Sequence, residues 1–185
     1  MPPSLAVDFL RCFIGKRVVS LVRYSWWPAE EVAGECGIKN SDAFSLTAGP
    51  LVICFDGGGI LGVASSPELN SVVVWDEGGR RSGQNRNGLD KDGELFPISG
   101  VGSYASEYWG GLINRPLSKV VVLKRENMNA KKQGLPSEVG LRFMFEGGES
   151  FIASHGLHDD SDDFSVLEES QLLPIPLRET MWIPA

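Results

Sequence analysis

The densest group of side chains that could do chemistry lies between residues 155 and 163, where two histidines and four aspartates fall within nine residues. Imidazole groups suit zinc or iron, and carboxylates suit calcium or magnesium, so one hypothesis is a divalent metal site. The spacing matches neither the calcium-loop pattern nor the zinc-helix motif, and the corresponding residues 66–70 of the first half hold no such set. The sequence therefore favours an acidic loop that contacts another protein, and it leaves metal binding by His155 and His158 and a merely solvated acidic loop as the alternatives.

Other catalytic arrangements have less support. The glycine run at residues 56–59 lacks the lysine and hydroxyl residue of a phosphate-binding loop, and its counterpart at residues 146–148 is also acidic, which would repel a phosphate. Both histidines lie in the acidic loop, and no Gly-x-Ser-x-Gly sequence marks a nucleophile. Asp56 and Glu146 could form an acid–base pair, but tight turns argue against the burial that such a pair needs. We therefore expect a protein that is not an enzyme and uses no cofactor.

Charge is distributed unevenly along the chain. The net charge is −7, yet residues 1–145 hold 16 basic and 15 acidic side chains, whereas residues 146–185 hold one basic and nine acidic ones. An acidic field of this kind repels nucleic acid and anionic lipid and attracts a basic partner. The basic loop at residues 80–91 is too small for a nucleic-acid site. We therefore predict a protein partner, with no nucleic acid and no membrane bound.

Tryptophan side chains are a natural complement to this acidic field. Trp26 and Trp27 end a predicted strand over residues 17–27, and because successive strand residues face opposite sides, one of the two should be exposed beside Pro28. Exposed tryptophans are frequent anchors at protein interfaces. The predicted partner-binding residues are Asp159, Asp160, Asp162, Asp163, Glu168, Glu169, Trp26 and Trp27.

The chain that must position these side chains repeats a pattern. Both halves contain an apolar strand ending in Phe-acid-Gly-Gly, at residues 55–58 and 145–148, and a second apolar strand ending in Ala-Ser, at residues 64–65 and 153–154. The glycines supply the positive φ angles that tight hairpin turns need. Such self-similarity predicts two structurally similar units.

An earlier strand also recurs, at residues 17–23 and 119–125, which aligns Leu21 with Leu123. Each half then reads as a helix, a strand, a glycine-turn hairpin and a further strand. Short turns between the strands favour antiparallel pairing. We therefore predict an α+β fold, mostly β, in which two similar helix-plus-antiparallel-hairpin units pack together.

The unit boundaries follow from composition. We predict a first β-rich unit at residues 1–76, a flexible linker loop at 77–103 and a second β-rich unit with a proline-rich tail at 104–185. Prolines in the tail predict extended structure that is not a central strand. Residues 44–47 are predicted as a short strand.

The remaining composition bears on location. The three cysteines have no paired spacing, which is typical of a reducing compartment. The N-terminal stretch lacks the order of a signal peptide, and no run of about 18 apolar residues occurs. We therefore expect a cytoplasmic protein.

The chain resembles bacterial immunity proteins of polymorphic toxin systems, which block a cognate toxin by occluding its site. The likeness is one of general character over the whole chain: charge gathered at one end, few motifs, and a helix that runs into a strand over residues 13–24. It implies a protein partner, such as a basic toxin domain, with no cofactor and no catalysis. The alternative is an enzyme or small-ligand-binding module with a pocket between the two units. A third hypothesis is a structural subunit of a larger assembly.

Overall fold

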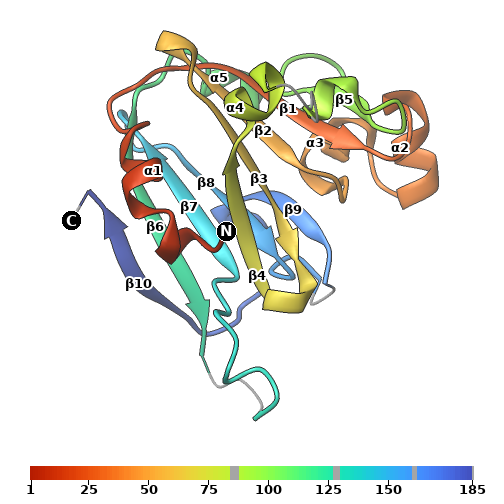
Figure 1. Ribbon diagram of the computed structural model, residues 1–185. Helices are drawn as coiled ribbons and strands as arrows, with labels where there is room; N and C mark the ends of the chain where they lie inside the picture. The colour runs from red at the N-terminus through yellow and green to blue at the C-terminus, as the bar shows by residue number, and fades with distance from the viewer. Residues whose placement is uncertain (84–87, 127–129, 160–161, 185) are drawn as a thin grey trace.

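The computed structural model describes residues 1–83, 88–126, 130–159 and 162–184, and its framework is two five-stranded antiparallel sheets (Figure 1). The first sheet, in the order β4-β3-β2-β1-β5, consists of β1 (Val18–Ser25), β2 (Leu51–Phe55), β3 (Ile60–Ser66), β4 (Ser71–Asp76) and β5 (Phe96–Ser99). The second, in the order β10-β6-β7-β8-β9, consists of β6 (Leu117–Arg125), β7 (Gly140–Phe145), β8 (Ser150–His155), β9 (Phe164–Glu168) and β10 (Leu177–Ile183).

The helices are short and lie at the ends and edges of the sheets. The α-helices are α1 (Val7–Arg11), α2 (Ala29–Cys36), α3 (Ala43–Leu46), α4 (Glu77–Ser82) and α5 (Glu107–Gly111). The 3-10 turns are η1 (Pro3–Leu5), η2 (Asn40–Asp42), η3 (Asp56–Gly58), η4 (Pro67–Leu69), η5 (Leu89–Lys91) and η6 (Glu169–Gln171). Within the described residues, no helix has the length and apolar composition needed to cross a bilayer.

The two sheets have the same topology, which confirms the predicted α+β, mostly β fold with two similar units. In each, a short helix precedes the strand that starts the unit, and that strand pairs with a glycine-turn hairpin on one side and with the last strand of the unit on the other. The turns have equal length, because the amide of Phe55 bonds to Gly59 O and that of Phe145 to Glu149 O, each at 2.9 Å.

The strand register corrects the alignment of the two halves. Each Phe of the Phe-acid-Gly-Gly motif, Phe55 and Phe145, pairs across a β-bulge with the start of the preceding strand. Counted from these fixed points, the residue that corresponds to Leu21 is Val120, so the predicted match with Leu123 is wrong by three residues. A run of valines permits several registers, and pairing with the neighbouring strand decides among them.

The predicted alignment of the second hairpin strands, β3 and β8, also needs correction. Leu51 pairs with Val63 in the first unit, and Leu141 pairs with Ala153 in the second. Ser65 therefore corresponds to His155, and the predicted match of the two Ala-Ser pairs is wrong by one residue.

The units meet at a pseudo-two-fold axis where β1 and β6 begin. A backbone bridge joins Arg17 to Pro116, and the hydrogen bonds on either side of it come in equivalent pairs. One such pair runs from Gly15 N to Leu117 O and from Asn114 N to Val18 O, each at 2.7 Å. Gly15 and Asn114 have φ angles of 81° and 66°, the left-handed conformation that glycine and asparagine tolerate best. The equivalent residues thus make the same turn into the seam.

The larger of two buried apolar clusters fills the space between the sheets, with buried side chains from both units. Trp109 of α5 is fully buried and joins the units: its ring lies 5.0 Å from that of Phe44 in the first unit and 5.5 Å from that of Phe151 in the second. Its indole N–H donates to Ser45 Oγ at 3.0 Å. Because the units share this core, they form one packed body.

Two local predictions differ from the structure. Residues 44–47 lie in α3 and its C-terminal cap and not in a strand, because Phe44 and Ser45 pack toward Trp109. The segment predicted as a linker contains α4, η5 and β5, and β5 pairs with β1 as an edge strand. The buried Glu77 carboxylate holds part of this segment, because it accepts hydrogen bonds from Trp75 Nε1 and Leu89 N, both at 2.7 Å.

The shared core predicts one cooperative unfolding transition that depends on Trp109. Trp109→Ala should lower the free energy of unfolding by about 3–5 kcal/mol, because it removes a buried ring and leaves a cavity. Chemical denaturation followed by circular dichroism measures this change. The matched control is Trp182→Ala on β10, since that ring is 44% exposed and its loss should cost about 1 kcal/mol or less. Two separate transitions in the wild-type protein would contradict the shared core.

Candidate functional site

The acidic loop lies at the junction of the two units. It begins directly after β8, and its aspartates Asp159, Asp162 and Asp163 are exposed, whereas Asp160 lies outside the described residues. The Gly156 amide donates to Asp163 O at 3.2 Å, which folds the loop back on its own start. The loop therefore presents carboxylates to solvent from a fixed base.

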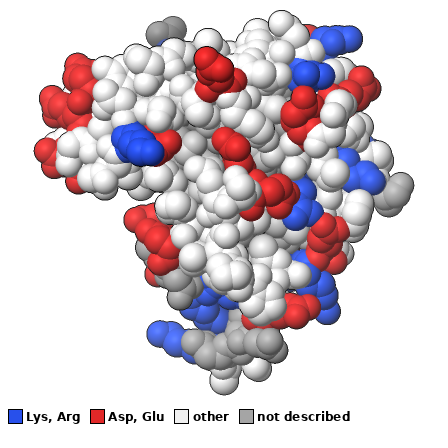
Figure 2. Space-filling view, turned by 180° about the vertical axis from the view of Figure 1, so that it is seen from behind, with Lys and Arg blue, Asp and Glu red and all other residues white. Residues whose placement is uncertain are grey.

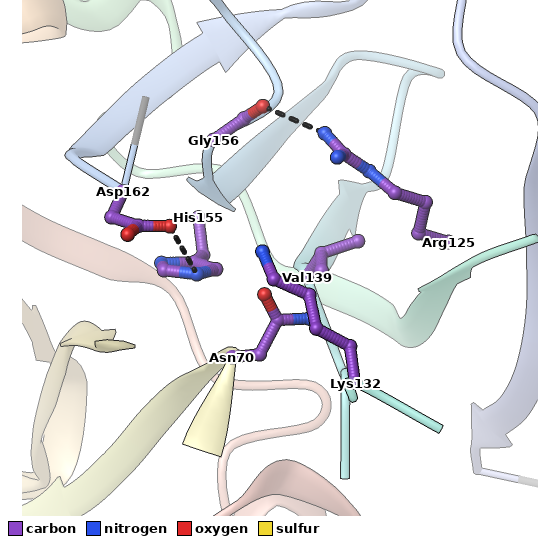
Figure 3. Close-up of a pocket in the computed structure, with 7 residues that line it drawn as sticks. All are labelled: Asn70, Arg125, Lys132, Val139, His155, Gly156 and Asp162. Atoms are coloured by element: carbon purple, nitrogen blue, oxygen red, sulfur yellow. Dashed lines mark hydrogen bonds and ion pairs between the residues drawn. The ribbon is translucent and has the colours of Figure 1, made fainter. Parts of the chain in front are cut away.

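His155 is the centre of a polar cluster beneath this loop (Figure 3). Its Nδ1 is hydrogen-bonded to the Ser65 hydroxyl of β3, and its Nε2 lies 3.7 Å from Asp162 Oδ1. Its backbone amide donates to Val139 O at 2.8 Å. Ser65 comes from the first unit and the others from the second, so the pseudo-equivalent residues Ser65 and His155 touch each other across the junction.

The cavity beside His155 is small. It has a volume of about 20 Å³ and is lined by Asn70, Arg125, Lys132, Val139, His155, Gly156 and Asp162. This is room for about one water molecule, whereas ligand pockets span about 300–1,000 Å³. Arg125 donates to Gly156 O at 3.2 Å and so holds the first residue of the loop (Figure 3).

A serine, a histidine and an aspartate in contact invite comparison with a hydrolase triad, but the geometry does not support that chemistry. The orienting acid of such a triad is buried, whereas the Asp162 side chain is 69% exposed. Ser65 is not among the residues that line the cavity of about 20 Å³ beside His155, so the part of the chain that the structure describes shows no substrate pocket formed by both residues. Within the described residues, no three His, Cys, Asp or Glu side chains are arranged to hold a metal ion. The cluster therefore joins the units and supports the loop.

Burial sets the protonation of His155. The side chain is only 3% exposed, and desolvation lowers its pKa below the usual value of 6.5. The Asp162 carboxylate raises the pKa in part, while Lys132 and Arg125 lower it further. The ring is therefore neutral at neutral pH.

The predicted tryptophans lie at another corner of the molecule. Trp26 and Trp27 are 57% and 45% exposed, so both are exposed, not one. Strand alternation does not apply to them because β1 ends at Ser25, before either residue. Phe96 pairs with Ser25 and is also exposed, and we call these three residues, Trp26, Trp27 and Phe96, the aromatic corner.

Helix α2 follows Trp26 and Trp27 in the chain, and its last residue lies near the acidic loop. Its carboxylates Glu30, Glu31 and Glu35 are exposed, and its last residue, Cys36, lies close enough to Asp163 for that carboxylate to contribute to its raised pKa, behind burial and Glu35. Figure 2 shows red side chains gathered at the upper left, where α2 lies, and further red side chains below them on the same side. We define the acidic face as Glu30, Glu31, Glu35, Asp159, Asp162 and Asp163.

Two of the predicted partner-binding residues have structural partners elsewhere. Glu168 forms a capping box with Gln171 at the start of η6. Glu169 forms an ion pair with Arg142 at 2.6 Å, and Arg142 also pairs with Glu179. The structure therefore does not place Glu168 and Glu169 with the acidic face, whose remaining described members lie together with α2.

An open hollow of about 440 Å³ lies at the seam between the units. Its lining includes Arg17, Arg115 and Glu146. Asp56, the predicted acid–base partner of Glu146, is not among the described residues that line the hollow, and its carboxylate accepts the Arg17 amide at 3.0 Å. The hollow is the nearest feature to the predicted pocket between the units.

Sequence reasoning missed two parts of this arrangement. Ser65 was not recognised as the partner of His155, although the repeat aligned in the correct register places the two at equivalent positions. Arg23 was also missed: it is fully buried, and its guanidinium donates to the carbonyls of Ser45 at 3.4 Å and Phe164 at 3.2 Å, and to that of Thr47. It thereby ties β1 to β9, next to the acidic loop.

Comparison of the chain with protein-family models, with curated proteins and with solved structures found no match.

The buried ring of His155 predicts a loss of stability in mild acid. The unfolded chain takes up a proton near pH 6.5, whereas the folded protein takes it up only at lower pH, so the contribution to stability is complete above pH 6.5 and is lost as pH falls below it. Denaturation curves at pH 8 to 5 measure this loss. His155→Gln should flatten the curve in this window, because it removes the group whose pKa burial lowers. An unchanged pH dependence in His155→Gln would contradict the assignment.

Proposed function

We propose that the protein is a binding protein that inhibits a basic partner protein, as an immunity protein neutralises a toxin by occluding its site. The observation that carries this proposal is the convergence of two acidic segments, α2 and the loop after β8, which are far apart in sequence. Exposed carboxylates from both segments lie on one side of the molecule, and the aromatic corner adjoins α2.

The acidic face and the aromatic corner contribute to different aspects of binding, the association rate and the affinity. Long-range attraction by carboxylates acts mainly on the association rate and on partner choice. Buried aromatic anchors supply most of the affinity of a typical interface. Trp26 and Trp27 are large, exposed and adjacent to Glu30, so an apolar pocket rimmed by lysine and arginine would complement them.

The negative charge of the acidic face indicates the class of protein that it could bind. A toxin that acts on nucleic acid presents a basic surface around its active site, because it must neutralise phosphates. An acidic face that covers this surface inhibits without any chemistry of its own. The small cavity at His155 is consistent with this role, since it has no room for a substrate.

A triple substitution on α2 tests the acidic face. Glu30→Gln, Glu31→Gln and Glu35→Gln together should slow association with the basic partner at low salt, and the effect should fade at high salt because exposed charges are screened. Stopped-flow association rates over a salt series measure this, with denaturation curves to show that stability is unchanged.

The control removes equal charge from other exposed positions. Glu107→Gln, Glu126→Gln and Glu146→Gln together alter the net charge by the same amount but leave the acidic face intact. If both triple variants slowed association equally, only net charge would matter and the proposed face would be wrong.

The hollow at the seam favours one alternative, a small-ligand-binding module. Its volume of about 440 Å³ falls within the range of ligand pockets. Under this alternative, Arg115→Gln would abolish binding of an anionic ligand and leave partner association intact. Under the proposed function, the hollow has no ligand to bind, so the wild-type protein and Arg115→Gln should both show no binding of an anionic ligand.

A further inference from the structure

The hydrogen bonds around His155 can exist in two arrangements. Ser65 Oγ is bonded to His155 Nδ1 and also lies 3.4 Å from Asp162 O, the backbone carbonyl of the acidic loop. A serine hydroxyl has one proton, so it donates to the ring or to the carbonyl, but not to both. The direction of the bond to the ring therefore decides whether Ser65 holds the loop.

The neutral ring selects one arrangement. Asp162 Oδ1 faces Nε2 at 3.7 Å, which favours the tautomer that carries its proton on Nε2. Nδ1 is then an acceptor, and the Ser65 hydroxyl donates to it. In this state Asp162 O receives no hydrogen bond from Ser65.

Protonation of the neutral ring reverses the direction of the hydrogen bond between Ser65 and His155. In the imidazolium both ring nitrogens donate, so Nδ1–H donates to Ser65 Oγ, and the Ser65 proton turns to Asp162 O. Nε2–H simultaneously gains a charged attraction to the Asp162 carboxylate. Both changes draw the same loop residue toward the junction and neutralise one charge of the acidic face.

We propose that Ser65 and His155 form a proton-operated clasp that couples the junction of the two units to the position of the acidic loop. Among the described residues, the charged groups that act on the ring are Asp162 of the loop, Lys132 of the segment before β7 and Arg125 at the end of β6, whose guanidinium points to Gly156 O (Figure 3). Burial and the two cations lower the pKa of the ring and Asp162 raises it, so the clasp closes only below the usual histidine pKa of 6.5. The clasp acts in the free protein and is independent of the proposed function. Where that function holds, acidification weakens partner capture.

Nitrogen-15 NMR of the free protein tests the clasp. At pH 8, Nε2 of His155 should carry the proton and Nδ1 should not, and on acidification Nδ1 should become protonated. The backbone signals of Asp162 and Asp163 should shift with the same midpoint. Nδ1 protonated at pH 8, or loop signals that do not follow the ring, would overturn the proposal.

Two variants distinguish the hydrogen-bond rearrangement through Ser65 from a direct effect of the imidazolium charge on the nearby loop. Ser65→Ala should leave the His155 titration visible but reduce the coupled shift at Asp162, because it removes the hydroxyl that bonds both to the ring and to Asp162 O. His158→Gln should preserve both the titration and the coupling, since His158 has no part in the clasp. If the Asp162 signal followed the ring equally well in Ser65→Ala, the charge of the imidazolium alone would move the loop and the clasp would be wrong.

Discussion

The rest of the structure depends on the seam at which two similar units meet about a pseudo-two-fold axis. Paired backbone hydrogen bonds around the bridge between Arg17 and Pro116 fix the start of β1 against the start of β6. Once these strands are fixed, each hairpin follows from its glycine turn, and the inner faces of both sheets close on one core. Neither sheet could bury its apolar face alone. The relative positions of the acidic loop and of helix α2, which come from different units, therefore depend on how the two units pair at the seam.

The surface features to which we assign a function lie where the two units differ in sequence and structure. Ser65 and His155 occupy equivalent positions yet carry different chemistry, so their meeting at the junction makes an asymmetric hydrogen bond. Arg23 is buried and its guanidinium donates to Phe164 O of the other sheet, whereas its equivalent, Val122, is apolar and can make no such bond. Helix α2 lies in the connection between β1 and β2, and the second unit has no described helix in the matching connection. These differences gather beside the acidic loop.

Sequence patterns predicted the architecture but not its register. The Phe-acid-Gly-Gly turns have a local cause, since glycine permits the backbone angles, and they identified both hairpins. The alignment of Leu21 with Leu123 failed because valine-rich strands look alike at several offsets, and pairing with another strand decides between them. Strand β5 was hidden in a polar segment, since an edge strand needs few apolar residues. The contact between Ser65 and His155 joins residues 90 positions apart, which no local pattern encodes.

The central claim is that the acidic face and the aromatic corner bind one basic protein. Photo-crosslinking in a lysate of the source organism over a salt series tests it most directly, with a crosslinking amino acid placed at Trp27 on the aromatic corner, at Asp159 on the acidic loop, or at Trp182 on β10. The account predicts that positions 27 and 159 capture the same basic protein, less efficiently as salt rises, and that position 182 does not. Capture of that protein from position 182 alone, or of an acidic protein from position 27, would contradict the account.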